Sequence, residues 1–419
     1  MKDIQHTIKY QRLTVPVLSV IIIVLVFGLG FVLGRSGFNI AWRDGEISYS
    51  VKGQLYPEDK EIDFTTFWEV WSLLEGKYVE RELEKESMVY GAVKGMVSAL
   101  DDPATRFFTP DETDEYEYER GGMLQGIGIE MGYMDNNIVI KRLIENAPAL
   151  TSGLKPGDII YKVDNESLED LTISEVAGKI RGEKGTDVLL TVLRGKNTDE
   201  LSFTITRDEV YVPSIEWEKL EEGIIVVSIR RFTEESLTDF MFLWDKIAGE
   251  IASESPSGVI IDVRGNGGGF LDGAVHVAGD FLDKGDVVVY IQDREEKLTA
   301  KSVTKKGVLG DVPVVILVDG GTASSSEIFA GALRYYERTS IIGEETYGKG
   351  TAQDVIKPEE WDGASIHVTT QKWLLPNKEW ISRETPIIPD IIVELTLEQI
   401  KKGDDPQLER AKEEVKNSF

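Results

Sequence analysis

A serine-rich run occupies the best position for a nucleophile in this sequence. Residues 319–328 follow the apolar run Val314–Val318 and open a segment whose apolar residues repeat at helical spacing. A serine at such a strand-to-helix turn is held exposed at the positive end of the helix, which suits a nucleophile. Ser and Thr are also good helix caps, so Thr322, Ser324, Ser325 and Ser326 can be read locally as a capping segment instead.

A lysine lies between two glycines in the run Gly343–Thr351, which nearly matches a phosphate-binding P-loop. Position 350 is glycine where the P-loop carries the hydroxyl that binds magnesium, and residues 351–356 have the pattern of a strand rather than a helix. This pattern argues against nucleotide binding. The glycines on both sides of Lys349 instead allow the backbone to pack closely and bury the amine.

The serine run and Lys349 together predict a Ser/Lys catalytic pair, because a neutral lysine can replace histidine as the general base. Burial lowers the pKa of lysine from its usual value of about 10.4, so such a site must be shielded from water. The composition fits this chemistry, because the chain has no Cys and only His6, His276 and His367. Thiol nucleophiles and thiolate metal sites are excluded, and a Ser-His-Asp triad or a three-histidine zinc site would need nearly every histidine. We expect no metal and no cofactor.

A glycine-rich loop, Asp262–Gly269, follows a buried apolar strand and has four glycines in its last five positions. Glycines permit positive φ angles and close approach of the backbone, and such loops present N–H groups to an anion or a developing oxyanion. A flexible connection is the alternative interpretation from local sequence.

A small β-rich domain is predicted over residues 110–207. The run Gly126, Ile127, Gly128 and Ile129 precedes a strand-like segment, and the turn Gly153–Asp158 and a short helix at Ile173–Ile180 follow it. The strands expected in this domain are residues 137–140, 159–163, 188–193 and 201–205. These motifs resemble a PDZ domain, in which the glycine loop binds a peptide's terminal carboxylate while the peptide adds a strand. Without the downstream turn, the glycines would indicate a plain hairpin.

The remaining core, residues 208–398, alternates β-type runs with helical ones, which is typical of an α/β domain. The strands expected are Ile224–Ile229, Val259–Val263, Val314–Val318, Ser340–Ile342 and Ile366–Thr370, and the helices are Thr238–Glu250, Leu271–Leu282 and Ser326–Tyr336. Residues 399–419 read as a charged helical tail.

Residues 63–109 read as two packed helices with an aromatic core stripe, because Phe67, Trp71, Leu74 and Tyr78 recur at spacings of three and four.

The N-terminus predicts a membrane anchor. Residues 15–34 are 20 uncharged, mostly apolar residues, or about 30 Å of helix, and no clear signal-peptide cleavage site follows them. Residues 1–14 carry three basic residues and one acid, so this stub is expected in the cytoplasm, and residues 35–62 form a linker beyond the membrane. The expected location is the bacterial cytoplasmic membrane, crossed once, with the catalytic part outside the cytoplasm. The chain's net charge of −28 argues against nucleic-acid binding.

The order of these motifs over residues 63–395 resembles the carboxy-terminal processing (tail-specific) serine proteases. The shared features include Leu100–Pro103, the PDZ domain, the Arg264–Gly269 loop, the serine run, Gly348–Thr351 and the closing Ile388–Asp390. The resemblance implies that Ser324 is the nucleophile, Lys349 the general base and Gln353 the residue that orients the lysine, and that backbone N–H groups of Gly268 and Ser325 form the oxyanion hole. It also implies a ClpP/crotonase-like protease core and substrates with free apolar C-termini, and it leaves a homo-oligomer open.

The sequence departs from the family pattern at two glycine or serine motifs. Thr322–Glu327 replaces the usual Ser-Ala-Ser-Ala-Ser-Glu, so Ser325 and Ser326 remain alternative nucleophiles, and Asn266–Gly269 replaces Asn-Pro-Gly-Gly. Arg181, next to the Gly182–Gly185 turn, either couples the PDZ domain to the catalytic centre or is a solvated cation at a helix end. We expect a membrane-anchored serine endopeptidase; the alternative is an inactive PDZ scaffold that binds C-terminal peptides.

Overall fold

The computed structural model describes residues 27–28, 38–43, 46–51, 63–80, 82–134, 137–169, 171–194 and 199–417. The chain separates into two compact units, residues 1–84 and 85–419, which are described one at a time. The expected stub, residues 1–14, and the expected anchor, residues 15–34, lie outside the described residues except for Phe27 and Gly28. Within the described ranges, no helix has the length and apolar character needed to cross a membrane.

The first unit contains a hairpin and one helix among its described residues. Strands β1 (Phe38–Arg43) and β2 (Glu46–Val51) pair antiparallel inside the segment expected to be a linker. Helix α2 (Thr65–Lys77) carries the aromatic residues that the sequence placed in a core, but none of its residues is buried. Within the described residues, the aromatic stripe expected from the sequence is therefore not buried on this helix.

The second unit begins with three short elements that border the catalytic cavity. Helix α3 (Lys85–Ser98) leads through a turn into β3 (Arg106–Phe108) and then helix α4 (Pro110–Arg120). Thr109 caps α4 and forms a reciprocal capping box with Glu112, and Pro110 occupies the first turn, which explains why a helix starts there.

The PDZ domain is confirmed as a sheet of order β10-β9-β7-β6-β5, with β8 added to β7. Its strands are β5 (Ile129–Met134), β6 (Asn137–Leu143), β7 (Ile159–Val163), β8 (Glu166–Ser167), β9 (Asp187–Arg194) and β10 (Asp199–Thr206), and its helices are α5 (Pro148–Ser152) and α6 (Ile173–Ile180). Strands β4 (Met123–Gly126) and β11 (Asp208–Tyr211) pair with each other where the chain enters and leaves the domain. The apolar residues of the sheet and of α6 form one buried core.

The α/β core is built on a sheet of order β12-β13-β14-β17-β18-β21, which is parallel except at β12. Its strands are β12 (Ile215–Lys219), β13 (Ile224–Ile229), β14 (Gly258–Asp262), β17 (Val314–Val318), β18 (Thr339–Gly343) and β21 (Ile391–Ile392). Its helices are α7 (Leu237–Ser253), α8 (Leu271–Ala278), α9 (Ser325–Tyr335), α10 (Leu397–Lys402) and α11 (Pro406–Asn417). Helix α8 is shorter than expected, because Gly279 caps it.

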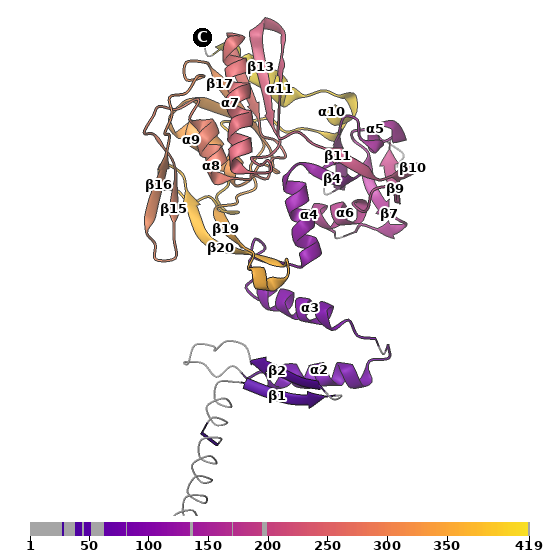
Figure 1. The fold of residues 1–419 in the computed structure, drawn as a ribbon. Helices are drawn as coiled ribbons and strands as arrows, with labels where there is room; N and C mark the ends of the chain where they lie inside the picture. The colour runs from indigo at the N-terminus through magenta and orange to yellow at the C-terminus, as the bar shows by residue number, and fades with distance from the viewer. Residues whose placement is uncertain are drawn as a thin grey trace, which may run out of the picture. The chain divides into compact units, whose positions relative to one another are not determined.

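Both faces of this sheet are buried, which explains the continuous apolar runs in the sequence. Alternate residues such as Val227 and Ile316 pack against α7, α8 and α9, whereas Ile260 and Leu317 face the other way and pack against α11 (Figure 1). Helix α11 lies in the segment expected to be a charged tail, and its apolar residues help to form the core.

A second sheet of order β16-β15-β20-β19 completes the unit and carries β3 on β20. Its strands are β15 (Val287–Gln292), β16 (Leu298–Ser302), β19 (Thr351–Ile356) and β20 (Ser365–Leu374). The strand expected at Ile366–Thr370 therefore belongs to an antiparallel layer rather than to the parallel sheet. Through β3 and β19, this sheet brings residues distant in sequence to the edge of one cavity.

Candidate active site

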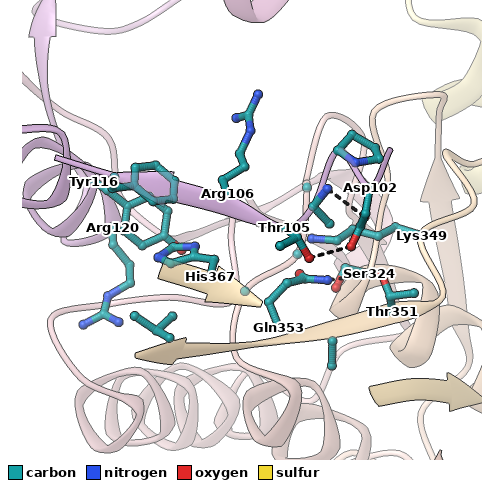
Figure 2. Close-up of a pocket in the computed structure, with 18 of the residues that line it drawn as sticks. Asp102, Thr105, Arg106, Tyr116, Arg120, Ser324, Lys349, Thr351, Gln353 and His367 are labelled. Atoms are coloured by element: carbon teal, nitrogen blue, oxygen red, sulfur yellow. Dashed lines mark hydrogen bonds between the residues drawn. The ribbon is translucent and has the colours of Figure 1, made fainter. Parts of the chain in front are cut away.

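A cavity of about 1650 Å³ collects the residues that the sequence singled out for catalysis. Its lining includes Ser324, Lys349, Gln353, Gly268 and Ser325. Figure 2 shows Ser324, Lys349 and Gln353 gathered at one end, with Tyr116, Arg120 and His367 at the other. Residues from the loop after α3, from the glycine loop after β14 and from β19 and β20 all contribute to its wall.

Ser324 sits at the turn between β17 and α9 in a strained backbone conformation. Its φ of 54° and ψ of −117° are uncommon for any residue with a side chain, and such strain costs of order 1–3 kcal/mol. The next residue, Ser325, is the first of α9, so the Ser324 side chain lies at the positive end of that helix. Ser325 and Ser326 are buried and their hydroxyls donate to the carbonyls of Gly269 and Asn266, which favours Ser324 among the three serines.

Glu327 holds the nucleophile and the lysine in place together. Its fully buried carboxylate accepts hydrogen bonds from the backbone N–H groups of Ser324 (2.8 Å), Gly348 (2.8 Å) and Lys349 (2.9 Å). The hydroxyl of Thr346 donates a fourth bond of 2.6 Å. Hydrogen bonds to an ionised acceptor are stronger than neutral ones, so this carboxylate fixes both loops relative to each other.

The backbone around Lys349 is enclosed on its other side. A side chain at Gly348 or Gly350 would overlap the carbonyls of Ser382 and Ile381. The carbonyl of Gly350 also accepts hydrogen bonds from the Trp380 indole N–H (2.9 Å) and the Trp373 backbone N–H (3.1 Å). The two glycines therefore permit the close packing that the sequence indicated.

The Lys349 amine is shifted toward the neutral form. Burial lowers its pKa, while the charges of Asp102 and Glu327 oppose that effect without cancelling it. A lowered pKa increases the fraction of neutral amine near neutral pH, which is what a general base needs.

Gln353 lines the same end of the cavity as this lysine (Figure 2). Lys349 precedes β19, and Gln353 is the third residue of that strand. The Gln353 amide donates to the hydroxyls of Thr351 (3.1 Å) and Thr369 (3.0 Å). Both bonds use the amide nitrogen and hold the side chain in the cavity wall.

The glycine loop approaches the nucleophile closely. A Cβ at Gly268, whose φ is +104°, would lie 2.8 Å from the Ser324 Cβ and 3.0 Å from the Ser325 nitrogen. The Gly268 N–H is donated to Asn266 Oδ1 (2.8 Å) in this structure. A substrate oxyanion would therefore have to compete with that side chain for the Gly268 N–H.

The PDZ loop is distinct from the catalytic cavity but connected to it through Arg181. The loop begins at Gly126, the last residue of β4, and ends at Ile129, the first residue of β5. Ile127 is buried. Gly128 has a φ of +76° and packs closely against Ala147. Arg181 lines the cavity, packs against Gly126 and forms an ion pair of 2.6 Å with Glu119 of α4. Arg181 is thus paired with Glu119, while 38% of its side chain remains exposed.

A second contact joins the PDZ domain to the core. Lys141 of β6 reaches Asp319, the residue that follows β17, with a nitrogen–oxygen distance of 2.8 Å. The other oxygen of Asp319 accepts the N–H groups of Gly265 (2.7 Å) and Gly321 (2.9 Å), so one carboxylate contacts the glycine loop, the serine loop and the PDZ domain. Sequence reasoning missed this ion pair, because its partners are 178 residues apart.

The C-terminal segment contacts the glycine loop through Arg264. Arg264 pairs with Asp262 (2.8 Å) on its own loop and with Asp405 (2.9 Å) just before α11, and it donates to Gln407 (2.9 Å). Sequence reasoning gave Asp405 and Gln407 no role.

Comparison with known proteins agrees with this fold and site. Residues 223–393 match the model of peptidase family S41, and residues 125–205 match that of the PDZ domain. The chain is 32% identical to the carboxy-terminal processing protease CtpB of Bacillus subtilis over 78% of this chain and 66% of that protein. It is 32% identical to a CtpA-like serine protease of Staphylococcus haemolyticus over 83% of this chain and 68% of the relative. The chain thus spans about two thirds of the length of these relatives.

The solved structure of a photosystem II D1 C-terminal processing protease has the same fold, with a TM-score of 0.56 at 24% identity over 79% of this chain and 92% of that one. A PDZ domain attached to an S41 core defines a class of serine peptidase. The chain belongs to the carboxy-terminal processing serine protease family.

Proposed function

We propose that this chain is a serine endopeptidase that binds protein C-termini through its PDZ domain and cleaves near them with a Ser/Lys mechanism. The observation that carries the proposal is the Glu327 carboxylate, which fixes Ser324 and Lys349 together at one cavity wall. A scaffold that only bound peptides would have no need for a strained serine and a buried amine held by one carboxylate.

The chemistry follows from the positions of these groups. Neutral Lys349 takes the proton of the Ser324 hydroxyl while the Ser324 oxygen bonds to the scissile carbonyl carbon and the carbonyl electrons move to oxygen. The protonated lysine then gives its proton to the leaving amine, and the acyl-enzyme forms. A water molecule then transfers a proton to the same lysine and its oxygen bonds to the ester carbon; as the bond from that carbon to the Ser324 oxygen breaks, the lysine returns the proton to Ser324 and is neutral again.

The remaining site roles belong to the same proposal. The Ser325 and Gly268 N–H groups stabilise the oxyanion, Gln353 orients Lys349, and the loop Gly126–Ile129 receives the substrate's terminal carboxylate. The negative charge that develops on the carbonyl oxygen lies at the start of α9, where the helix dipole favours an anion. Arg181 couples the PDZ domain to the cavity through Glu119.

Cleavage of a peptide with a free apolar C-terminus tests the proposal. Purified Ser324→Ala and Lys349→Ala should each lose activity by at least a thousandfold, while their thermal unfolding stays close to that of the wild type. Retained activity in Lys349→Ala would refute the Ser/Lys mechanism, and an inactive wild-type protein that still binds the peptide would favour the inactive scaffold.

The membrane location is part of the proposal and rests on the sequence alone. Residues 15–34 are uncharged and follow a basic stub, which favours a single span with the catalytic part outside the cytoplasm. A phosphatase reporter fused after residue 62 should be active only if it reaches the outside of the cell, and an inactive reporter there would contradict the orientation.

A further inference from the structure

We propose that Asp102 is a positioning residue that acts through Lys349, as the counter-charge that stabilises the lysine when it is protonated. This inference rests on the proposed Ser/Lys mechanism. Asp102 follows α3 and lines the same cavity as Ser324 and Lys349. Figure 2 shows Asp102 and Lys349 at the same end of this cavity, and the charge of Asp102 acts on the Lys349 amine.

The Asp102 carboxylate is held in this position by its own turn. Its Oδ1 atom accepts the Ala104 N–H (3.0 Å), and its Oδ2 atom accepts the Thr105 hydroxyl (2.6 Å). The Thr105 oxygen in turn accepts the Thr369 N–H of β20 (3.0 Å). The Thr369 hydroxyl accepts from Gln353 (3.0 Å), so the same network reaches the residue proposed to orient Lys349.

These hydrogen bonds keep the carboxylate charged. Burial raises the pKa of Asp102, but the bonds from Thr105, Thr369 and backbone N–H groups outweigh burial and lower it overall. Asp102 is therefore an anion at every pH at which the lysine titrates. An anion that does not titrate in that range is a constant counter-charge for the amine.

Two other titratable groups, Glu327 and His367, interact electrostatically with Lys349 and have to be considered with Asp102. Glu327 of α9 also favours the charged lysine, but its carboxylate is already bound by four donors. Burial and the charge of Lys349 both lower the pKa of His367 of β20, and Arg120 and Arg106 act on His367 in the same direction. Asp102 thus has the largest effect of any charged neighbour on the Lys349 amine.

The counter-charge matters most while the tetrahedral intermediate forms. As the Ser324 oxygen bonds to the carbonyl carbon, its proton moves to the lone pair of the Lys349 nitrogen and the carbonyl electrons move to oxygen. The new ammonium is half-buried, and a fixed anion in the same cavity stabilises it with little reorganisation. The same anion makes the resting ammonium harder to deprotonate, so Asp102 decreases the fraction of neutral lysine at low pH but speeds the reaction of the lysine that is neutral.

The matched substitution Asp102→Asn should separate these two effects. In the pH profile of kcat/KM, we expect the rise on the acid side to move to lower pH. We expect the kcat/KM reached at high pH to fall by roughly tenfold to a hundredfold. The substitution Asp101→Asn at the exposed neighbour is the control and should leave both unchanged, since the charges that act on the Lys349 amine are those of Asp102 and Glu327. Asp102→Glu keeps the charge and should keep the acid limb at its wild-type position.

A second readout does not depend on activity. In the inactive Ser324→Ala background, the pH dependence with which Lys349 reacts with trace acetic anhydride reports its protonation directly. Adding Asp102→Asn should move that midpoint to lower pH. If the midpoint of the Lys349 reactivity curve is unchanged or moves to higher pH, the proposed role of Asp102 is refuted. Loss of cleavage in Lys349→Ala would still support the proposed function in that case. Loss of cleavage without any shift in midpoint would show that Asp102 is only structural.

Discussion

At the scale of single residues, Glu327 explains how a serine and a lysine from different loops can meet reliably. Ser324 precedes α9, whereas Lys349 lies after β18, and the two loops share the pairing of β17 with β18 and the backbone bond from the Tyr347 N–H to the Thr322 carbonyl (2.9 Å). The Glu327 carboxylate adds bonds at the nucleophile and the lysine themselves, and it pairs backbone N–H groups that would otherwise lack a partner in the core.

Glu327→Gln should therefore damage catalysis more than substrate binding. The amide keeps one acceptor oxygen but turns an N–H₂ group toward backbone N–H donors, so at least one loop loses its anchor. We expect kcat to fall by a hundredfold or more with a small change in KM, and the free energy of unfolding to fall by about 1–3 kcal/mol. Steady-state kinetics measure kcat and KM, and urea unfolding measures the free energy of unfolding. A near-normal kcat in the folded variant would show that catalysis does not need the Glu327 carboxylate to connect the two loops.

The pH dependence of cleavage follows from the Lys349 amine. Burial lowers the pKa of Lys349 and two carboxylates oppose that shift, so the amine loses its proton below the pH at which an exposed lysine does. Because the neutral form is the base, kcat/KM should rise with pH through that pKa and fall as the solution is acidified. A profile that is flat or decreases across this range would be inconsistent with a lysine base.

Ser324 and Lys349 were accessible from the sequence because their motifs are local. A serine run after an apolar strand and a lysine between glycines can be recognised without knowing which segments meet. The role of Asp102 could not be predicted in this way, since it depends on β20 bringing Thr369 against the turn after α3. The acceptor of the Gly268 N–H likewise depends on the conformation of the loop and not on its composition.

At the scale of elements, the buried strands were the most predictable part of the fold. The expected bounds of β13 and β17 agree with the structure, because a parallel strand covered on both faces needs a continuous apolar run. The charged helix α11 was harder to interpret. Only Ala411 and Val415, with Gln407, are buried in it, and three positions among twelve do not make an apolar face that stands out in the sequence.

Val415→Ala tests whether α11 is part of the core. The Val415 side chain is fully buried and packs against Gly258 at the start of β14, so its loss leaves a small cavity. We expect a decrease of about 1–2 kcal/mol in the free energy of unfolding. The control Glu413→Ala, on the exposed side of the same helix, should change it by less than about 0.5 kcal/mol. Equal effects of the two substitutions in urea unfolding would contradict this packing.

At the scale of the whole second unit, two ion pairs connect PDZ residues to the catalytic region. Arg181 binds Glu119 of α4, and Lys141 binds Asp319 beside the serine loop. Burial lowers the pKa of Lys141, but the charge and hydrogen bond of Asp319 together with the charges of Glu344 and Glu130 outweigh burial and raise it, so the lysine stays charged. Movement of the PDZ domain would therefore act on both the cavity wall and the loop that carries Ser324.

Lys141→Ala should loosen that connection. Asp319 would keep its two backbone donors but lose the only side-chain cation that it contacts in the described part of the chain, at an expected cost of about 1–3 kcal/mol. Amide hydrogen exchange in residues 263–269 and 319–324 should become faster. The control Lys162→Ala removes an exposed pair of the same domain, 3.5 Å from Glu200, and should leave exchange in both loops unchanged. Unchanged exchange in Lys141→Ala would mean that the domains are not coupled there.

The central claim is that Ser324 is a nucleophile activated by Lys349. A fluorophosphonate probe that forms a covalent bond with activated serines tests it most directly, with the modified residue located by peptide mass spectrometry. We predict one added probe per wild-type chain, on Ser324, and no labelling of Ser324→Ala or Lys349→Ala. Labelling of Ser325 or Ser326 in the wild type, or labelling of Ser324 at the normal rate in Lys349→Ala, would contradict the account.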